Sequence, residues 1–153
     1  MARKRIGILT GGGDVPGLNS VIKTVTYRSS ENDIDVIGLR RGWEALTHLN
    51  MDDPGSRRRY IMPLNRENTR IIDRRGGTVL HSSRTNPSKM QKLPDHLAGK
   101  DFPVFQGSKA ETWDVTGHVL ANLSGLGIEH LIAIGGDCLE DKRTNPSNYA
   151  NQP

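Results

Sequence analysis

Short apolar runs alternate with stretches of helical periodicity in the first part of this chain. Residues 4–10 form a largely apolar run that stops at three consecutive glycines, Gly11 to Gly13, as a buried strand does on entering a tight turn. Apolar side chains then return every three or four positions and predict a helix over residues 16–29. Residues 34–39 predict a second strand and residues 43–49 a short helical segment. A strand–helix–strand start indicates a parallel sheet.

The periodicity is weaker in the middle of the chain. Pro54 and Gly55 indicate a turn, and residues 59–64 predict another strand. A helix is predicted over residues 65–75 because Gly76-Gly77 follows it, and glycine commonly ends a helix. Residues 78–80 predict a brief strand.

The last third of the chain returns to a clear pattern. Residues 82–107 are rich in Ser, Asn, Pro and Lys and predict a long surface loop. An amphipathic helix over residues 115–126 precedes an apolar strand over 130–134. We therefore predict an α/β fold with a Rossmann-like, three-layer, parallel-sheet domain over residues 1–137. Residues 138–153 lack apolar periodicity and predict a divergent, disordered tail.

Composition restricts the class of protein further. With 153 residues, 34% hydrophobic and 25% charged, the chain is typical of one soluble domain. Its single cysteine, Cys138, excludes an internal disulfide and favours a reducing compartment. The five histidines do not fall at metal-ligand spacings, so we expect no structural zinc. No apolar run reaches membrane-spanning length, and we expect a cytoplasmic protein with no membrane partner.

The charge distribution favours anionic partners. The net charge of +4 is concentrated in basic clusters at residues 3–5, 40–41, 57–59 and 74–75. No aromatic residues alternate with them, and aromatics make up only 5% of the chain, so we expect no nucleic-acid partner. We interpret the clusters mainly as solvated surface, with Arg40 and Arg75 as exceptions.

The glycine cluster is a candidate phosphate site. Gly11, Gly12, Gly13 and Gly17 would let the backbone approach an anion, with the amides at the helix N-terminus directed at it. The run lacks the Gly-Lys-Ser/Thr ending of a P-loop, and a turn that serves packing alone is the other interpretation. A dinucleotide site is an alternative, but Arg40 and Arg41 stand where an acidic residue would bind ribose, so it would take NADP rather than NAD.

Two further motifs carry charged side chains. Asp137 follows the strand over residues 130–134, at the sheet edge where open α/β folds bind ligands, and can either hold Mg²⁺ or cap a helix. Arg84 follows a glycine turn and two serines, Ser82 and Ser83, and can either bind phosphate oxygens or lie on the surface.

These three motifs, in this order, resemble the ATP- and pyrophosphate-dependent 6-phosphofructokinases. The resemblance is most specific over residues 6–19, Ile-Gly-Ile-Leu-Thr-Gly-Gly-Gly-Asp-Val-Pro-Gly-Leu-Asn. Residues 38–46 are similar to the family's glycine-flanked turn, and residues 75–87 to its Arg-Gly-Gly-Thr to Ser-x-Arg segment. The similarity runs from residue 4 to about residue 137, so the chain resembles a truncated, amino-terminal fragment of the phosphofructokinase family.

The resemblance implies a set of roles. Gly12 and Gly13 would lie against the phosphates of the donor, ATP or pyrophosphate, and Arg84 with Thr85 would contact that donor. Gly136 and Asp137 would bind phosphate and Mg²⁺, with Asp137 as the metal ligand. Fructose 6-phosphate would be the acceptor in this glycolytic reaction, and partners would be copies of the chain or full-length subunits.

The chain also departs from the family pattern. Cys138 and Leu139 follow Asp137, where the family has Gly or Asp and then Ser or Thr, so the choice between ATP and pyrophosphate stays open. The Thr-Ile-Asp-Asn-Asp segment that carries the family's catalytic base is absent. We therefore expect no catalytic residue here and an inactive fragment. The alternatives are a non-catalytic NADP-like or nucleotide-binding module and a regulatory fragment.

Overall fold

A four-stranded mixed sheet forms the centre of the protein, as a computed structural model describing residues 3–106 and 111–135 shows. The central strand β1 pairs in parallel with β2 on one side and β6 on the other, whereas β3 pairs antiparallel with β2. The strands, in spatial order, are β3 (Ile61–Leu64), β2 (Asp35–Leu39), β1 (Arg5–Gly11) and β6 (His130–Gly135).

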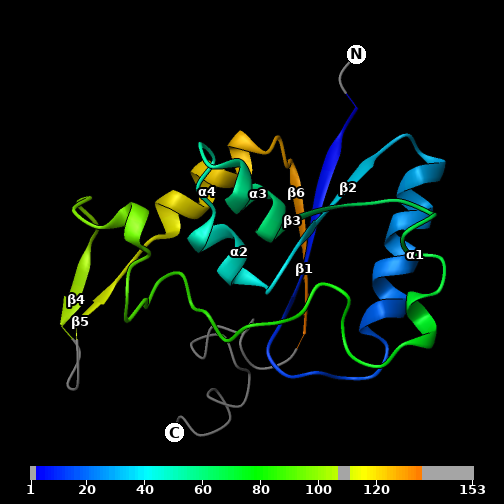
Figure 1. Ribbon diagram of the computed structural model, residues 1–153, viewed down its shortest axis with the longest axis horizontal. Coiled ribbons are helices and arrows are strands. Elements are labelled where there is room, and N and C mark those ends of the chain that lie inside the picture. Colours follow the sequence, from blue (N-terminus) through cyan, green and yellow to red (C-terminus); the bar gives the residue numbers. More distant parts are fainter. Residues whose placement is uncertain (1–2, 107–110, 136–153) are drawn as a thin grey trace, which may run out of the picture.

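Helices cover both faces of this sheet (Figure 1). One face carries α1 (Leu18–Glu31) and the 3₁₀ turn η1 (Ile72–Arg74). The other carries α2 (Trp43–His48) and α4 (Thr116–Gly125). The predicted three-layer α/β class is thus confirmed, and β1, β2 and β6 are parallel as expected. Only β3 departs from the parallel arrangement, because the chain reverses at the carboxyl end of β2 and returns beside it.

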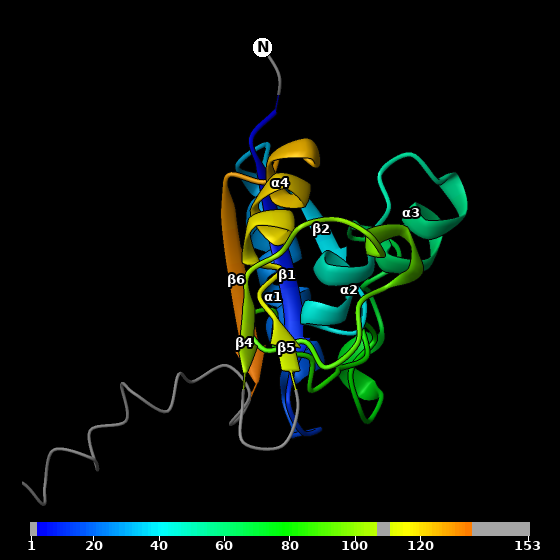
Figure 2. The same ribbon diagram turned by 90° about the vertical axis from the view of Figure 1, so that its left-hand side faces the viewer.

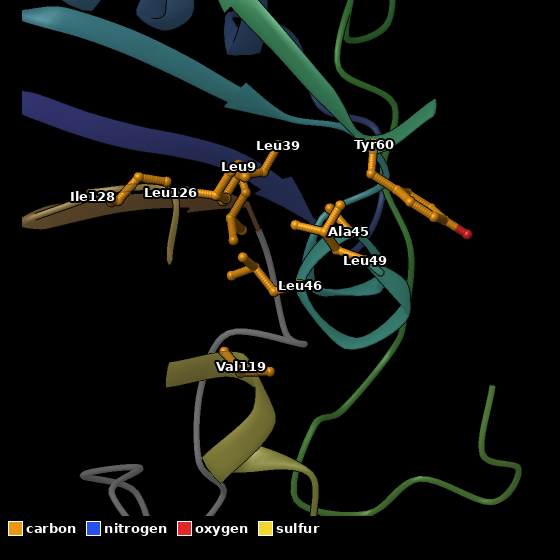
Figure 3. Close-up of a cluster of buried hydrophobic side chains, with 9 residues drawn as sticks. All are labelled: Leu9, Leu39, Ala45, Leu46, Leu49, Tyr60, Val119, Leu126 and Ile128. Atoms are coloured by element: carbon orange, nitrogen blue, oxygen red, sulfur yellow. The ribbon is translucent and has the colours of Figure 1, made fainter. Parts of the chain in front are cut away.

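The core lies in two clusters, one on each side of β1. Adjacent residues of a strand point to opposite faces, so Ile8 packs beneath α1 while Leu9 packs beneath α2 and α4. Both side chains are fully buried, which explains the continuous apolar run of this strand. Figure 3 shows the second cluster, made of Leu9, Leu39, Ala45, Leu46, Leu49, Tyr60, Val119, Leu126 and Ile128.

Two predicted elements between β3 and residue 80 are wrong. Residues 65–75 do not form a helix beyond η1, because Asn65 and Asn68 exchange side-chain hydrogen bonds with each other's backbone amides at 2.8 and 3.0 Å. Residues 78–80 form a turn rather than a strand, because side chains bind two of their amides.

The segment predicted as a turn at Pro54 is a helix, α3 (Pro54–Tyr60), which lies at the outer side of its layer in Figure 2. Asp53 caps it by accepting hydrogen bonds from two amides, and proline at the first helical position is well tolerated.

The predicted loop 82–107 contains a 3₁₀ turn, η2 (Asp95–Leu97), and the strand β4 (Val104–Gln106), which pairs with β5 (Glu111–Trp113). None of the described helices is long and apolar enough to cross a membrane.

Three histidines gather where η2 meets α2 and α4. The ring centroids of His96 and His118 are 5.7 Å apart, and His48 interacts with His96 electrostatically. The side-chain nitrogen of Asn122 donates to the carbonyl of Leu49 at 3.1 Å and lies 3.0 Å from Nε2 of His118. The same nitrogen of Asn122 also donates to the carbonyl of Leu46 at 2.9 Å, so Asn122 joins α4 to the end of α2. Nε2 of His96 is buried without a partner among the described residues.

Burial lowers the pKa of His48, His96 and His118 below the ordinary value of 6.5. Below that value the unfolded chain binds more protons than the folded one, so protonation favours unfolding. Stability should be complete above about pH 6.5 and fall as the pH decreases through this value, by up to about 1.4 kcal/mol per pH unit for each proton taken up. Urea unfolding at pH 7.5, 6.5 and 5.5 measures this loss.

The contribution of one ring can be separated with His118→Gln. Glutamine is also polar but does not titrate in this range, so the loss of stability between pH 7.5 and 5.5 should shrink. The exposed His130 provides the matched control, His130→Gln. Equal acid sensitivity of the wild type and His118→Gln would contradict the assignment.

Candidate functional site

β1 ends in a glycine loop that leads into α1. Gly12 is buried with φ of 75°, a conformation that favours glycine, and its amide donates to the carbonyl of Ser83 at 3.3 Å. Gly13 is exposed, and a Cβ placed on it would meet no atom within 4 Å. α1 begins behind Gly17 without a side-chain cap. The loop therefore leaves open space beside amides that suit an anion.

Asn19 joins this loop to the second glycine turn. Its side chain is almost fully buried, accepts from the amide of Val79 at 2.8 Å and donates to the carbonyl of Arg75 at 3.2 Å. Both ends of the Gly76-Gly77 turn are thus bound by one residue of α1. The turn is fixed against the start of that helix.

Thr10 fixes the next part of the same segment. Its hydroxyl lies 3.1 Å from that of Thr78 and donates to the carbonyl of His81 at 2.6 Å. Gly42, at the start of α2, passes so close that a Cβ there would lie 2.6 Å from the carbonyl oxygen of Thr10. Residues 75–85 therefore run along the carboxyl end of β1.

This path brings Arg84 and Thr85 to the glycine loop. Ser83 binds the amide of Gly12 through its carbonyl, and its hydroxyl donates to the Thr85 hydroxyl at 3.1 Å. Arg84 is exposed and forms no ion pair within the described part of the chain. Its guanidinium is available to an anion bound at the same edge.

β6 ends next to β1 at this edge. Gly135 is the register partner of Gly11, has φ of 146°, and a Cβ on it would overlap the carbonyl of Gly11. Only glycine fits this approach of two backbones. Gly136 and Asp137, predicted to bind phosphate and metal, lie outside the described residues.

A cavity of about 380 Å³ lies between the glycine loop and the Arg74–Gly77 segment. Asp14 and Arg75 both line it. Asp73 also lines the cavity; a hydrogen bond from the ammonium of Lys23, at 2.8 Å, lowers the pKa of its carboxyl. Cationic, anionic and backbone groups therefore meet here, at the edge where open α/β sheets bind ligands.

Comparison with known proteins shows which family shares these motifs. The family model described as "Phosphofructokinase" matches residues 5–139. The chain belongs to the phosphofructokinase family. The match includes the glycine loop, the Arg75–Thr85 segment and the end of β6.

Named relatives in this family use different donors. The chain is 38% identical over 137 residues to a pyrophosphate–fructose 6-phosphate 1-phosphotransferase of Dictyoglomus thermophilum, covering 90% of this chain and 30% of the relative. It is 32% identical to ATP-dependent 6-phosphofructokinase 1 of Thermus thermophilus, covering 88% and 32%. The chain thus spans about a third of the length of these relatives.

Solved phosphofructokinases share the fold. The structure from Saccharomyces cerevisiae matches with a TM-score of 0.61 and 22% identity over 88% of this chain and 14% of that one. The T-state structure from Pichia pastoris matches with a TM-score of 0.62 and 23% identity, covering 90% and 12%.

The structure does not favour the NADP-like alternative. Arg40 lies against Met62, with its Nη2 3.6 Å from the sulfur and its Nε buried. Arg41 forms an ion pair with Glu44 at 3.2 Å. Neither guanidinium is held open for a 2′-phosphate.

Sequence reasoning missed the residues that position the site. Asn19 and Thr10 are polar side chains at buried positions, and buried polar groups are almost always hydrogen-bonded. Asn19 stands directly after Leu18, on the buried side of α1, and this was the available signal.

We expect Asn19→Ala to destabilise the protein by about 1–3 kcal/mol, because it leaves the Val79 amide without an acceptor. Asn19→Asp keeps an acceptor for Val79 and should lose less. Urea unfolding at pH 7.5 measures both, and the exposed neighbour variant Ser20→Ala should stay within about 0.5 kcal/mol of the wild type. An unchanged free energy of unfolding in Asn19→Ala would show that this side chain does not hold the Gly76-Gly77 turn.

Proposed function

We propose that this chain binds the phosphoryl donor of a 6-phosphofructokinase reaction, ATP or pyrophosphate, at the carboxyl ends of β1 and β6. The hydrogen bond between Gly12 and Ser83 carries the proposal, because it joins the glycine loop to the segment that bears Arg84 and Thr85. Residues 1–137 would form this donor-binding unit. Its phosphate contacts would come from Gly12, Gly13, Arg84, Thr85 and Gly136.

Mg²⁺ would be held by Asp137. The observation that supports this is the pairing of Gly135 with Gly11, which places the end of β6 at the edge where β1 ends. Carboxylate oxygen is a ligand that Mg²⁺ prefers. The ion would neutralise phosphate charge, which is most of what phosphoryl transfer requires from a protein.

The acceptor in the family reaction would be fructose 6-phosphate, phosphorylated on its 1-hydroxyl. Transfer needs a base that accepts the proton of this hydroxyl. The 153 residues contain no Thr-Ile-Asp-Asn-Asp segment. We therefore propose that this chain alone binds the donor but does not catalyse transfer.

We propose that the chain pairs with further copies of itself or with full-length subunits, and only full-length subunits would supply the base that it lacks. Among the described strands, β6 pairs with β1 on one side only. Its other edge presents unpaired backbone groups, which readily accept another strand.

Isothermal titration of the 153-residue chain with MgATP and with magnesium pyrophosphate tests donor binding. Arg84→Gln should weaken the bound donor at least about tenfold, because a charge-assisted hydrogen bond to phosphate contributes about 1.5–3 kcal/mol. Lys89→Gln, which removes another exposed cation of the same segment, should change the affinity less than about twofold.

NADPH serves as the competing ligand in this titration. Binding of NADPH without binding of either phosphoryl donor would overturn the proposal. Formation of fructose 1,6-bisphosphate by the isolated chain would overturn the proposed lack of catalysis while leaving donor binding intact.

A further inference from the structure

A second, larger cavity lies away from the glycine loop. Its volume is about 660 Å³, within the range of small-molecule sites. The end of α2, the helix α3 and the segment around η2 line it, and Figure 2 shows α3 on the outer side of α2. Its lining includes His48, Arg59, Tyr60, Lys92, Asp95 and His96.

Two cations line this cavity from separate elements. Arg59 belongs to α3 and Lys92 to the segment before η2, and neither forms an ion pair with any described residue. Of the two aspartates in the lining, Asp53 is already engaged, since it accepts from the amides of Gly55 and Ser56 at 2.8 and 3.1 Å. The Asp53 carboxylate is thus directed to the start of α3, while Arg59 and Lys92 have no carboxylate partner among the described residues and Asp95 is the second acid of the lining.

Arg59 is held in place before any ligand arrives. Its guanidinium carbon lies 5.4 Å from the centroid of the Tyr60 ring, a cation–π distance. Tyr60 is buried in the core, and its hydroxyl end points away from the other labelled side chains in Figure 3. α3 is tied to the end of α2 by a 3.0 Å hydrogen bond from the amide of Asn50 to Ser56. Such preorganisation reduces the entropy lost on binding.

The histidines of this cavity are suited to hydroxyl groups. The hydroxyl of Thr47 contacts the carbonyls of Trp43 and Glu44 at 3.1 and 3.2 Å and lies 2.9 Å from Nδ1 of His48. In the tautomer in which Nδ1 donates to this hydroxyl, Nε2 is an acceptor. Burial lowers the pKa of both His48 and His96, so neither adds a charge near neutral pH. Together with Asp95, the two histidines give this side of the cavity hydrogen-bond acceptors for hydroxyl groups.

We infer that this cavity binds a hydroxyl-bearing phosphate monoester, with its phosphate on Arg59 and Lys92 and its hydroxyls on His48 and Asp95. A guanidinium and an ammonium are the groups that proteins use for phosphate. The site is distinct from the donor site. The six residues of α2 separate them by about 9 Å along the helix, from Gly42 beside Thr10 to His48.

Glycerol 3-phosphate and inorganic phosphate are the probes, titrated into the full 153-residue chain carrying Arg84→Gln and into the unmodified chain. Glycerol 3-phosphate should bind both chains with the same affinity and at least about tenfold more tightly than inorganic phosphate. The double variant Arg59→Gln/Lys92→Gln should weaken it at least about tenfold. The matched control is Arg57→Gln/Arg58→Gln, which removes two charges from the same helix outside the cavity and should change binding less than about twofold.

Three results would overturn the inference. They are equal weakening by the two double variants, equal affinity for the two probes, and loss of binding on Arg84→Gln alone. Loss on Arg84→Gln would assign the binding to the donor site instead. Amide exchange of α2 and α3 in each variant distinguishes local loss of the cations from unfolding, since only unfolding raises exchange throughout both helices.

Discussion

The close approach of backbones at the carboxyl end of β1 is the constraint on which the site depends. Gly135 meets Gly11 there, Gly42 meets Thr10, and Ser83 meets the amide of Gly12. Side chains would keep these segments apart, so glycine stands at most of the contacts. Segments from four parts of the sequence thereby meet at one small region, next to the segment that bears Arg84. The apolar clusters on both faces of β1 fix the position of this strand and so support these contacts.

The sequence predicted the regular part of this arrangement well. β1, α1, β2, α4 and β6 have apolar patterns dictated by burial, and their positions were predicted within about two residues. Two of the wrong predictions, the helix over residues 65–75 and the strand over residues 78–80, concern segments whose backbone amides bind side chains, either of polar neighbours or of residues far away in the sequence. Such bonds leave no periodicity. The antiparallel direction of β3 could not be predicted either, because the apolar pattern of a strand does not show in which direction it pairs with its neighbour.

The site followed the same rule. Gly12, Gly13, Arg84 and Thr85 were predicted as donor-binding residues; the structure brings their two segments together, and their role in binding stays a prediction. Their supports, Asn19 and Thr10, were missed because they act through backbone atoms 56 to 71 residues away. The histidine cluster was also unpredicted, since His48, His96 and His118 come from three elements that meet only in the folded protein. Spacing rules detect ligands along one element, not across several.

The order of strands has a consequence during synthesis on the ribosome. β1 lies inside the sheet, and Ile6 pairs with His130. One edge of β1 therefore stays unpaired until a strand that is synthesised 124 residues later has emerged. At ordinary elongation rates of about 5–20 residues per second, synthesis of these residues takes roughly 6–25 s. An unpaired apolar strand is a template for wrong pairing during this time. The nascent chain should therefore depend on chaperones until β6 emerges.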